Sequence, residues 1–176
     1  MKKMGIAAAL LTLLLCACGG QAAETASGEA GHAWDTALMV QGTRVNGETS
    51  VADLLALLGG DYEYAEAISC VYDGMDKTYT YPDAVVYTYP AEDGECLMEL
   101  YCTGGEVETA LGGVTFGAAR EEVIAAFGQN FTESGSVLRY ENDTAQSEDY
   151  EPDAVYFELT DGKVTAIATV AEHRAE

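Results

Sequence analysis

Two spacings of hydrophobic residues alternate along the chain and predict its elements. After Ser50, which can cap a helix, apolar side chains recur at intervals of three and four until Gly59-Gly60 ends the run: Val51, Leu54, Leu55 and Leu58. Beyond residue 77 the interval falls to two, which predicts three strands with turns between them: 78–81, 84–89 and 96–102. A strand over 37–41 and a short return over 43–45 precede the helix.

The same order then repeats along the second half of the chain. Residues 117–128 predict a helix, and segments of period two after it predict three more strands: 137–140, 154–159 and 164–170. The motif Pro82-Asp83-Ala84-Val85 recurs as Pro152-Asp153-Ala154-Val155. We therefore expect an α+β protein of two tandem repeats, 36–106 and 107–172, each a helix followed by an antiparallel meander, with 173–176 as a tail.

The N-terminus has the pattern of an export signal. Lys2 and Lys3 precede an apolar run over 6–15, which is too short to span a bilayer as a helix because that needs roughly 20 residues. The run ends in Leu15-Cys16-Ala17-Cys18, which resembles the lipobox of bacterial lipoproteins. The resemblance implies that residues 1–17 are removed and that Cys18 carries lipid. An ordinary cleaved signal and a short buried helix are the alternatives.

This interpretation gives the protein a location and an anchor. Residues 18–35 are rich in small side chains and lack apolar periodicity, so we expect a flexible tether. The folded part would then lie in the bacterial cell envelope, on the extracytoplasmic side of the membrane and attached through Cys18. The acyl chains must supply the anchoring, because no polybasic segment accompanies them.

Charge narrows the classes of partner. Lys2 and Lys3 leave with the signal, so the remaining chain carries 6 Lys and Arg against 30 Asp and Glu, a formal charge of −24. Such a chain lacks the cations that binding of nucleic acid or of an anionic lipid surface requires. The acidity favours cations or basic partners, and a simple solvated surface is the alternative.

The repeated pattern resembles known families. A tandem helix-and-meander unit behind an export signal is similar to the β-lactamase-inhibitor-protein-like fold, which implies one curved sheet with helices on one face. Residues 117–123, closing at Phe127-Gly128, resemble the helix signature of outer-membrane assembly lipoproteins of the BamE type, although Ala118 stands where Ser or Thr is usual. Residues 69–81 resemble a segment of uncharacterised lipoproteins of gut Firmicutes. These likenesses imply a fold and no known activity.

The chain is poor in catalytic groups, and we expect no enzyme. Its two histidines, His32 and His173, lie in the tether and the tail, so no His-assisted nucleophile or zinc set can be assembled. Cys96 and Cys102 lie on one predicted strand and cannot pair with each other. Cys70 precedes the first strand of the meander, which starts at the same end as the third, so we expect a structural disulfide between Cys70 and Cys96, with Cys102 buried as a small apolar residue. A redox-active thiol is the alternative.

An acidic loop over 141–151 offers oxygen ligands for calcium, although its spacing is not that of an EF-hand. Its candidate ligands are Asp143, Glu148, Asp149 and Glu151. The segment 73–76 is a second candidate, and a solvated loop is the alternative. No other cofactor is expected.

The leading hypothesis is a surface-anchored, non-enzymatic module for protein binding or envelope assembly. Tyrosine is rigid and amphipathic and therefore suits recognition, so five tyrosines of the first meander are candidate contacts on an open sheet face: Tyr79, Tyr81, Tyr87, Tyr89 and Tyr101. Strand alternation must turn about half of them toward the helices. A calcium or cationic-ligand binding protein that uses the acidic loops, and a purely structural envelope component, are the alternatives.

Overall fold

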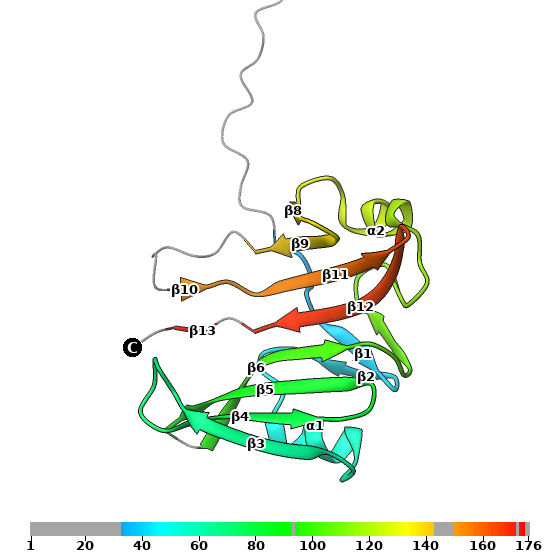
Figure 1. Cartoon of the computed structure of the whole chain (residues 1–176). Helices are drawn as coiled ribbons and strands as arrows, with labels where there is room; N and C mark the ends of the chain where they lie inside the picture. The colour runs from blue at the N-terminus through cyan, green and yellow to red at the C-terminus, as the bar shows by residue number, and fades with distance from the viewer. Residues whose placement is uncertain (1–32, 93, 143–149, 172, 175–176) are drawn as a thin grey trace, which may run out of the picture.

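The computed structural model describes residues 33–92, 94–142, 150–171 and 173–174. One antiparallel sheet of eight strands, in the order β3-β4-β5-β6-β12-β11-β9-β8, dominates this part of the chain (Figure 1). A smaller sheet has the order β2-β1-β7, and β10 pairs with β13. The strands are β1 Leu38–Val40, β2 Thr43–Val45, β3 Glu63–Ile68, β4 Met75–Thr80, β5 Ala84–Ala91, β6 Gly94–Cys102, β7 Val107–Thr109, β8 Thr132–Ser134, β9 Val137–Glu141, β10 Tyr150–Glu151, β11 Ala154–Thr160, β12 Lys163–Val170 and β13 His173–Arg174, and the helices are α1 Val51–Leu58 and α2 Arg120–Phe127.

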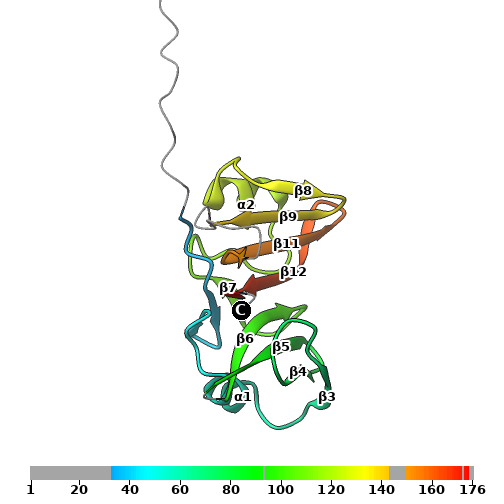
Figure 2. The ribbon, with the colours of Figure 1, turned by 90° about the vertical axis from the view of Figure 1, so that its left-hand side faces the viewer.

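The predicted α+β class, with a curved sheet covered by helices on one face, is wrong: the described chain is mostly β. Each helix is only 8 residues long, because a glycine in a left-handed conformation, Gly59 or Gly128, ends it after about two turns. The strands β1, β2 and β7 form a second sheet that packs behind the centre of the large one (Figure 2). The two short helices therefore supply only part of the covering layer, and β1, β2 and β7 supply the rest.

The order of the large sheet is symmetrical about its central pair. Four strands follow α1 and four follow α2, and the last strand of each set, β6 and β12, pair antiparallel from Cys102–Ile167 to Glu99–Val170. The repeated Pro-Asp-Ala-Val motif does not fall at equivalent positions, however. Val85 lies opposite Tyr101, outside the core, whereas Val155 is fully buried in it. A shift of one residue in a strand moves a side chain to the other face of the sheet. The valine of the first copy therefore points away from the core, and the valine of the second copy points into it.

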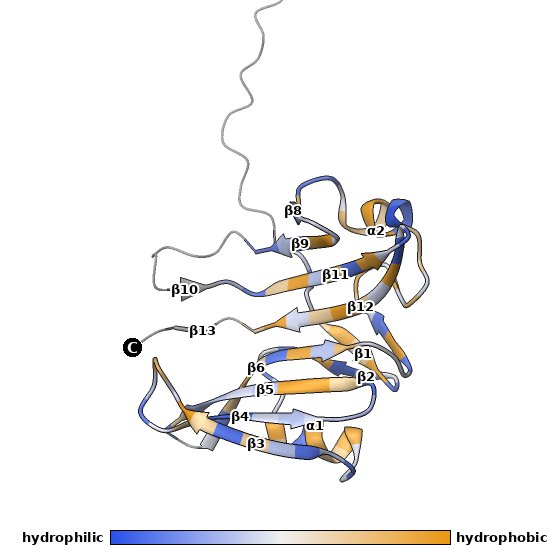
Figure 3. Cartoon of the chain, in the orientation of Figure 1, coloured by the Kyte–Doolittle hydropathy of each residue, from blue (hydrophilic) through white to orange (hydrophobic). Residues whose placement is uncertain are grey.

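The first helix forms as the sequence predicts. The Ser50 hydroxyl accepts a hydrogen bond from the backbone N–H of Asp53 at 3.1 Å, and Val51 and Leu54 are buried. Behind the large sheet these side chains join a single core that takes residues from both halves of the sheet. Its largest fully buried members include Tyr140, Phe157, Leu97, Leu100, Leu138 and Ile167. Figure 3 shows α1 as a hydrophobic element beneath the lower strands.

The folded part begins earlier than the predicted boundary at residue 36. The Trp34 indole N–H donates to the Phe127 carbonyl at 2.9 Å, and its ring packs edge-on against Tyr140 at 5.6 Å. Trp34 and Asp35 are therefore part of the fold and not of the tether. Residues 173–174, predicted as tail, form β13. Cys18 and His32 lie outside the described residues.

Several strands were not predicted. Residues 63–68, for which the sequence predicts no element, form β3, whose six side chains are all exposed. The strands β7 and β8 have only 3 residues each, too few for a periodic signal. No helix in the described ranges has both the length and the apolar character needed to cross a bilayer.

Candidate functional site

One face of the eight-stranded sheet is uncovered by any described segment. Figure 1 looks onto this face, with α1, β1 and β2 behind the sheet. Side chains that lie directly opposite each other on neighbouring strands point to the same face, so the register identifies its residues. One row crosses β5, β6, β12, β11 and β9: Val85, Tyr101, Ala168, Tyr156 and Arg139. The next row is Tyr87, Glu99, Val170, Ala154 and Glu141. We call these two rows the open face.

Two tyrosine–glutamate pairs cross the centre of the open face in opposite directions. The Tyr101 hydroxyl on β6 donates to Glu158 on β11 at 3.2 Å, and the Tyr156 hydroxyl on β11 donates to Glu99 on β6. Between them, β12 contributes Ala168, which is fully buried. The two rings therefore approach across this small residue, with centroids 6.4 Å apart. The four side chains hold one another in place, which reduces the conformational entropy that binding would remove.

Burial is the main cause that raises the pKa of both Tyr101 and Tyr156, and the nearby glutamates raise it further. Both phenols therefore stay protonated at neutral pH and can donate hydrogen bonds to the carboxylates. Glu99, Glu141 and Glu158 carry formal negative charges on or beside the open face, and Arg139, paired with Glu141, is the positive residue of its two rows. The face is acidic and aromatic.

The five tyrosines predicted as contacts divide between the two faces. Tyr87 is exposed, and Tyr89 and Tyr101 are half-buried on its side of the sheet. Tyr79 and Tyr81 point the other way and are buried, with hydroxyls that donate to Glu95 at 3.1 Å and to the Gly59 carbonyl at 3.1 Å. These two are therefore not contacts, because alternation along β4 and the residue after it places them in the core.

Sequence reasoning missed Tyr156 and the two glutamates that complete the cluster. Tyr156 alternates with the core residue Phe157, so the period of two contained its signal. The partnership of β6 with β12, which brings Tyr156 near Tyr101, joins residues distant in sequence and leaves no local pattern.

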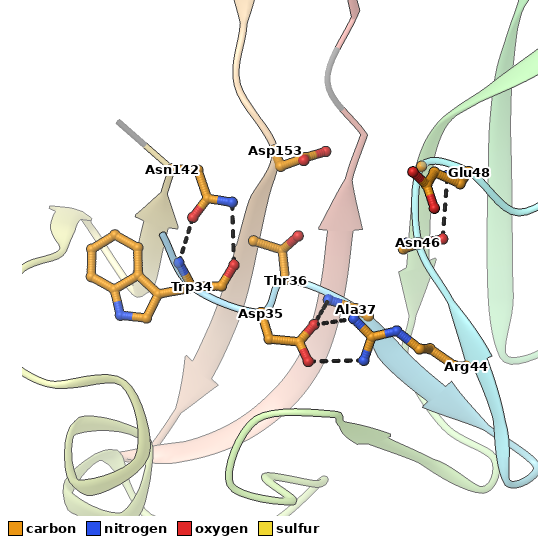
Figure 4. Close-up of a pocket in the computed structure, with 10 residues that line it drawn as sticks. Trp34, Asp35, Thr36, Ala37, Arg44, Asn46, Glu48, Asn142 and Asp153 are labelled. Carbon is orange, nitrogen blue, oxygen red and sulfur yellow. Dashed lines mark hydrogen bonds and ion pairs between the residues drawn. The ribbon is translucent and has the colours of Figure 1, made fainter. Parts of the chain in front are cut away.

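A cavity of about 550 Å³ lies at one side of the sheet (Figure 4). Four separate stretches of chain line it: 34–37, residues 44 and 46–48, Asn142 and Asp153. The Asn142 side chain closes one wall, because its Oδ1 accepts the Trp34 backbone N–H at 2.6 Å and its Nδ2 donates to the Trp34 carbonyl at 3.2 Å. None of these lining residues was predicted as a site residue, since they come together only through the fold.

The cavity is acidic. Arg44 forms hydrogen bonds of 2.8 and 2.6 Å with the two oxygens of Asp35, and this contact lowers the pKa of Asp35. Glu48 and Asp153 add two further carboxylates to the lining (Figure 4). The lining therefore carries three acidic groups against one guanidinium, a composition that favours a positively charged ligand.

The predicted calcium site falls largely outside the structure. Asp143, Glu148 and Asp149 are not among the described residues, and only the backbone of Glu151 is described, in β10. Within the described ranges, no three His, Cys, Asp or Glu side chains are grouped so as to hold a metal ion, and this includes the segment 73–76. Calcium binding by the loop stays a prediction.

The predicted disulfide is not formed. Cys70, Cys96 and Cys102 are free thiols, exposed, half-buried and buried respectively. Cys70 lies in the turn between β3 and β4, whereas Cys96 is on β6. β5 lies between β4 and β6, so the turn that carries Cys70 does not adjoin the strand that carries Cys96.

No family model, curated protein or solved structure matches the chain. The family likenesses drawn from the sequence therefore stay predictions, and functional inference rests on the geometry of the open face and the cavity.

Proposed function

We propose that this protein is a lipid-anchored, non-enzymatic binding module that docks a basic protein partner on its open face. The observation that carries the proposal is the central cluster, in which Tyr101 pairs with Glu158 and Tyr156 with Glu99. Its two aromatic rings and two carboxylates form a preorganised surface that no described segment covers (Figure 1).

The chemistry of the cluster selects the partner. Carboxylates bind lysine and arginine through charge-assisted hydrogen bonds, and tyrosine rings attract the same cations through their faces. Five strands span about 20 Å at the usual strand spacing, which suits a protein surface better than a small ligand. The charge of the whole chain, −22, would also accelerate the approach of a basic partner.

In this proposal the lipid anchor determines where the module acts. A lipid on Cys18 and a tether that ends before Trp34 would hold the open face at the membrane surface, where it meets partners in the envelope. Cys18→Ser should move the protein from the membrane fraction to the soluble fraction. A variant that stays in the membrane fraction after a carbonate wash would contradict lipid anchoring.

The binding proposal is tested by cross-linking the protein in its own cells and identifying a stoichiometric partner by mass spectrometry. The dissociation constant of the purified pair is then compared between the native chain and Glu99→Gln with Glu158→Gln. These changes remove two charges but keep oxygen acceptors for the tyrosine hydroxyls. We expect binding to weaken about tenfold, equivalent to roughly 1.4 kcal/mol.

The matched control is Glu108→Gln with Glu121→Gln, which removes two charges from β7 and α2. It should bind as tightly as the native chain. Equal affinity in the open-face variant and the native chain would remove the open face from the proposal. Absence of any partner above background would favour a structural envelope role or a small ligand.

The cavity supports a second candidate function, the binding of a small organic cation. Its carboxylates, Glu48 and Asp153, and its volume of about 550 Å³ suit an amine or guanidinium compound of ordinary ligand size. Calorimetric titration with a panel of polyamines and basic amino acids tests this function, and Glu48→Gln should abolish any heat of binding. Calcium is tested separately by a thermal melt, because a ligand at 100 times its Kd stabilises the native state by about 2.7 kcal/mol.

A further inference from the structure

Exposed hydrophobic side chains are concentrated at one edge of the sheet. On the described part of the chain five large hydrophobic residues are strongly exposed, and four belong to β3 or its flanks: Tyr62 at 38%, Tyr64 at 49%, Ile68 at 79% and Val71 at 52%. In Figure 3 the end of β3 and the turn after it are coloured as hydrophobic. Scattered exposed residues need no explanation, but a group on one edge strand marks a contact surface.

The same edge offers unpaired backbone groups. β3 is the outermost strand and pairs only with β4, in an unbroken register from Glu63–Thr80 to Ile68–Met75. The Ser69 N–H donates to the Gly74 carbonyl at 3.1 Å, and hydrogen-bonded pairs alternate along an antiparallel ladder. Residues 63, 65 and 67 therefore bond to β4, and the amides of Tyr64, Glu66 and Ile68 point away from the sheet.

The opposite edge lacks these features. β8 has 3 residues, and all are polar: Thr132, Glu133 and Ser134. Glu133 forms an ion pair with Arg120 at 2.7 Å. Short, polar and charged edges are the usual protection against added strands, so β8 is protected and β3, with 6 residues and an apolar end, is not.

We propose that the outer edge of β3 binds an extended basic peptide segment of a partner as an additional strand. Residues 61–76 contain five acidic side chains and no lysine, arginine or histidine, so a second copy of this edge would repel it. A peptide with alternating basic and apolar residues is complementary. Its basic side chains would lie on the face of Glu63, and its apolar ones on the opposite face, beside Tyr64 and Ile68. Glu66 is on that second face too, where its carboxylate accepts the Tyr64 hydroxyl.

Aromatic packing prepares the edge for such a strand. The Tyr62 ring contacts Tyr79 at 5.2 Å and Tyr81 at 5.4 Å, and the Tyr64 ring contacts Tyr79 at 5.4 Å. The Tyr64 hydroxyl also donates to Glu66. Tyr62 and Tyr64 are thus supported by buried residues while their outer surfaces stay exposed. This surface shares no residue with the open face, so it does not depend on the function proposed there.

The test uses the full chain and a short peptide in which lysine and valine alternate. Fluorescence anisotropy should detect saturable binding, and amide hydrogen exchange should slow selectively at Tyr64, Glu66 and Ile68 in the bound state. Ala65 and Ala67, whose amides already bond to β4, serve as internal controls. A peptide of the same composition with its lysines and valines in separate blocks should bind several-fold more weakly.

Two variants test strand addition at this edge, and the block peptide separates it from simple charge attraction. Glu66→Pro removes an outward N–H, which edge strands tolerate, and should abolish the exchange protection. If that variant fails to fold, Ile68→Lys, at a residue that is 79% exposed, should weaken binding several-fold without altering the backbone. Unchanged exchange at the three amides under saturating peptide would overturn the proposal. Concentration-dependent dimers lost in Ile68→Lys would assign the edge to a second copy instead.

Discussion

At the scale of single residues, burial separates the three described cysteines into different chemical classes. Cys70 is exposed, whereas Cys102 is 1% exposed and burial raises its pKa to about 12. Because the thiolate is the reactive form, iodoacetamide should modify Cys70 in the native protein and Cys102 only after unfolding. Peptide mapping by mass spectrometry gives the modification of each residue. Modification of Cys70 only after reduction would mean that the cysteine is oxidised, in favour of the predicted bridge.

The ion pair beside the cavity makes a prediction about pH. The hydrogen bond from Arg44 lowers the pKa of Asp35 below its ordinary 3.8, so the folded state binds this proton more weakly than the unfolded state. The resulting stabilisation is present above about pH 4 and is lost as the pH falls through the lower pKa of the folded state. The effect is small, because both side chains are substantially exposed.

This prediction is checked with Asp35→Asn and with Asp61→Asn as a control on an exposed residue. Urea midpoints should fall for Asp35→Asn at pH 7, and the difference from the native chain should shrink at pH 2. A difference of the same size at both values would show that Asp35 contributes through its shape or its bond to Ala37 and not through its charge.

The tyrosines show how far residue patterns carry a prediction. Alternation places Tyr79 and Tyr81 on one face of the sheet and Thr80, which is exposed, on the other, but it does not say which face meets the core. The register with the neighbouring strands decides this, because Tyr79 lies opposite Val86, and Val86 lies opposite the core residue Leu100. The sequence therefore predicts that Tyr87, Tyr89 and Tyr101 belong together, but it does not predict that they are the tyrosines on the open face.

At the scale of elements, the two helices differ in how they begin. Ser50 caps α1 with its hydroxyl, whereas Ala119 precedes α2 and has no side-chain acceptor. Only half of a capping box forms at α2. The Glu122 side chain accepts the Ala119 backbone N–H at 2.7 Å, but Ala119 has no side-chain oxygen that could accept the Glu122 backbone N–H. Ser50→Ala should therefore destabilise the protein by about 1 kcal/mol, and Ala119→Ser should stabilise it by a similar amount.

Urea unfolding of the two variants measures both effects. The double variant should show them adding, because α1 and α2 lie at opposite ends of the large sheet (Figures 1 and 2). A destabilising Ala119→Ser would mean that the packing of Ala119 beside Lys163, where it forms an isolated bridge, outweighs the new cap.

Elements with an apolar period were predicted, and elements without one were not. The stripe of α1 and the alternation of β5, β6, β11 and β12 place their residues within one or two positions of the observed bounds. β3 has no buried residue, so its side chains carry no period that could separate a strand from a link. The predicted layer of helices failed for a related reason: the sequence shows where β1 forms, but not that it pairs with β7 more than 60 residues later.

At the scale of the whole molecule, the pairing of β6 with β12 joins the two halves of the large sheet into one body. Core residues from both halves form a single cluster, from Leu38 through Leu100 to Ile167. Trp34 strengthens this connection, because it precedes α1 in the chain yet packs against Tyr140 and bonds to Phe127 in the other half. We therefore expect the halves to unfold together.

Leu54→Ala tests this cooperation, because Leu54 is fully buried in α1 and the protein's single tryptophan reports on the far half. Removing the buried side chain should destabilise the protein by about 3 kcal/mol. If the sheet is one cooperative unit, the Trp34 fluorescence midpoint and the circular dichroism midpoint in urea should fall by the same amount. Glu121→Ala, at an exposed position of α2, should leave both midpoints within experimental error. A Trp34 midpoint that stays unchanged while circular dichroism falls would show that β6 and β12 join two units that unfold separately.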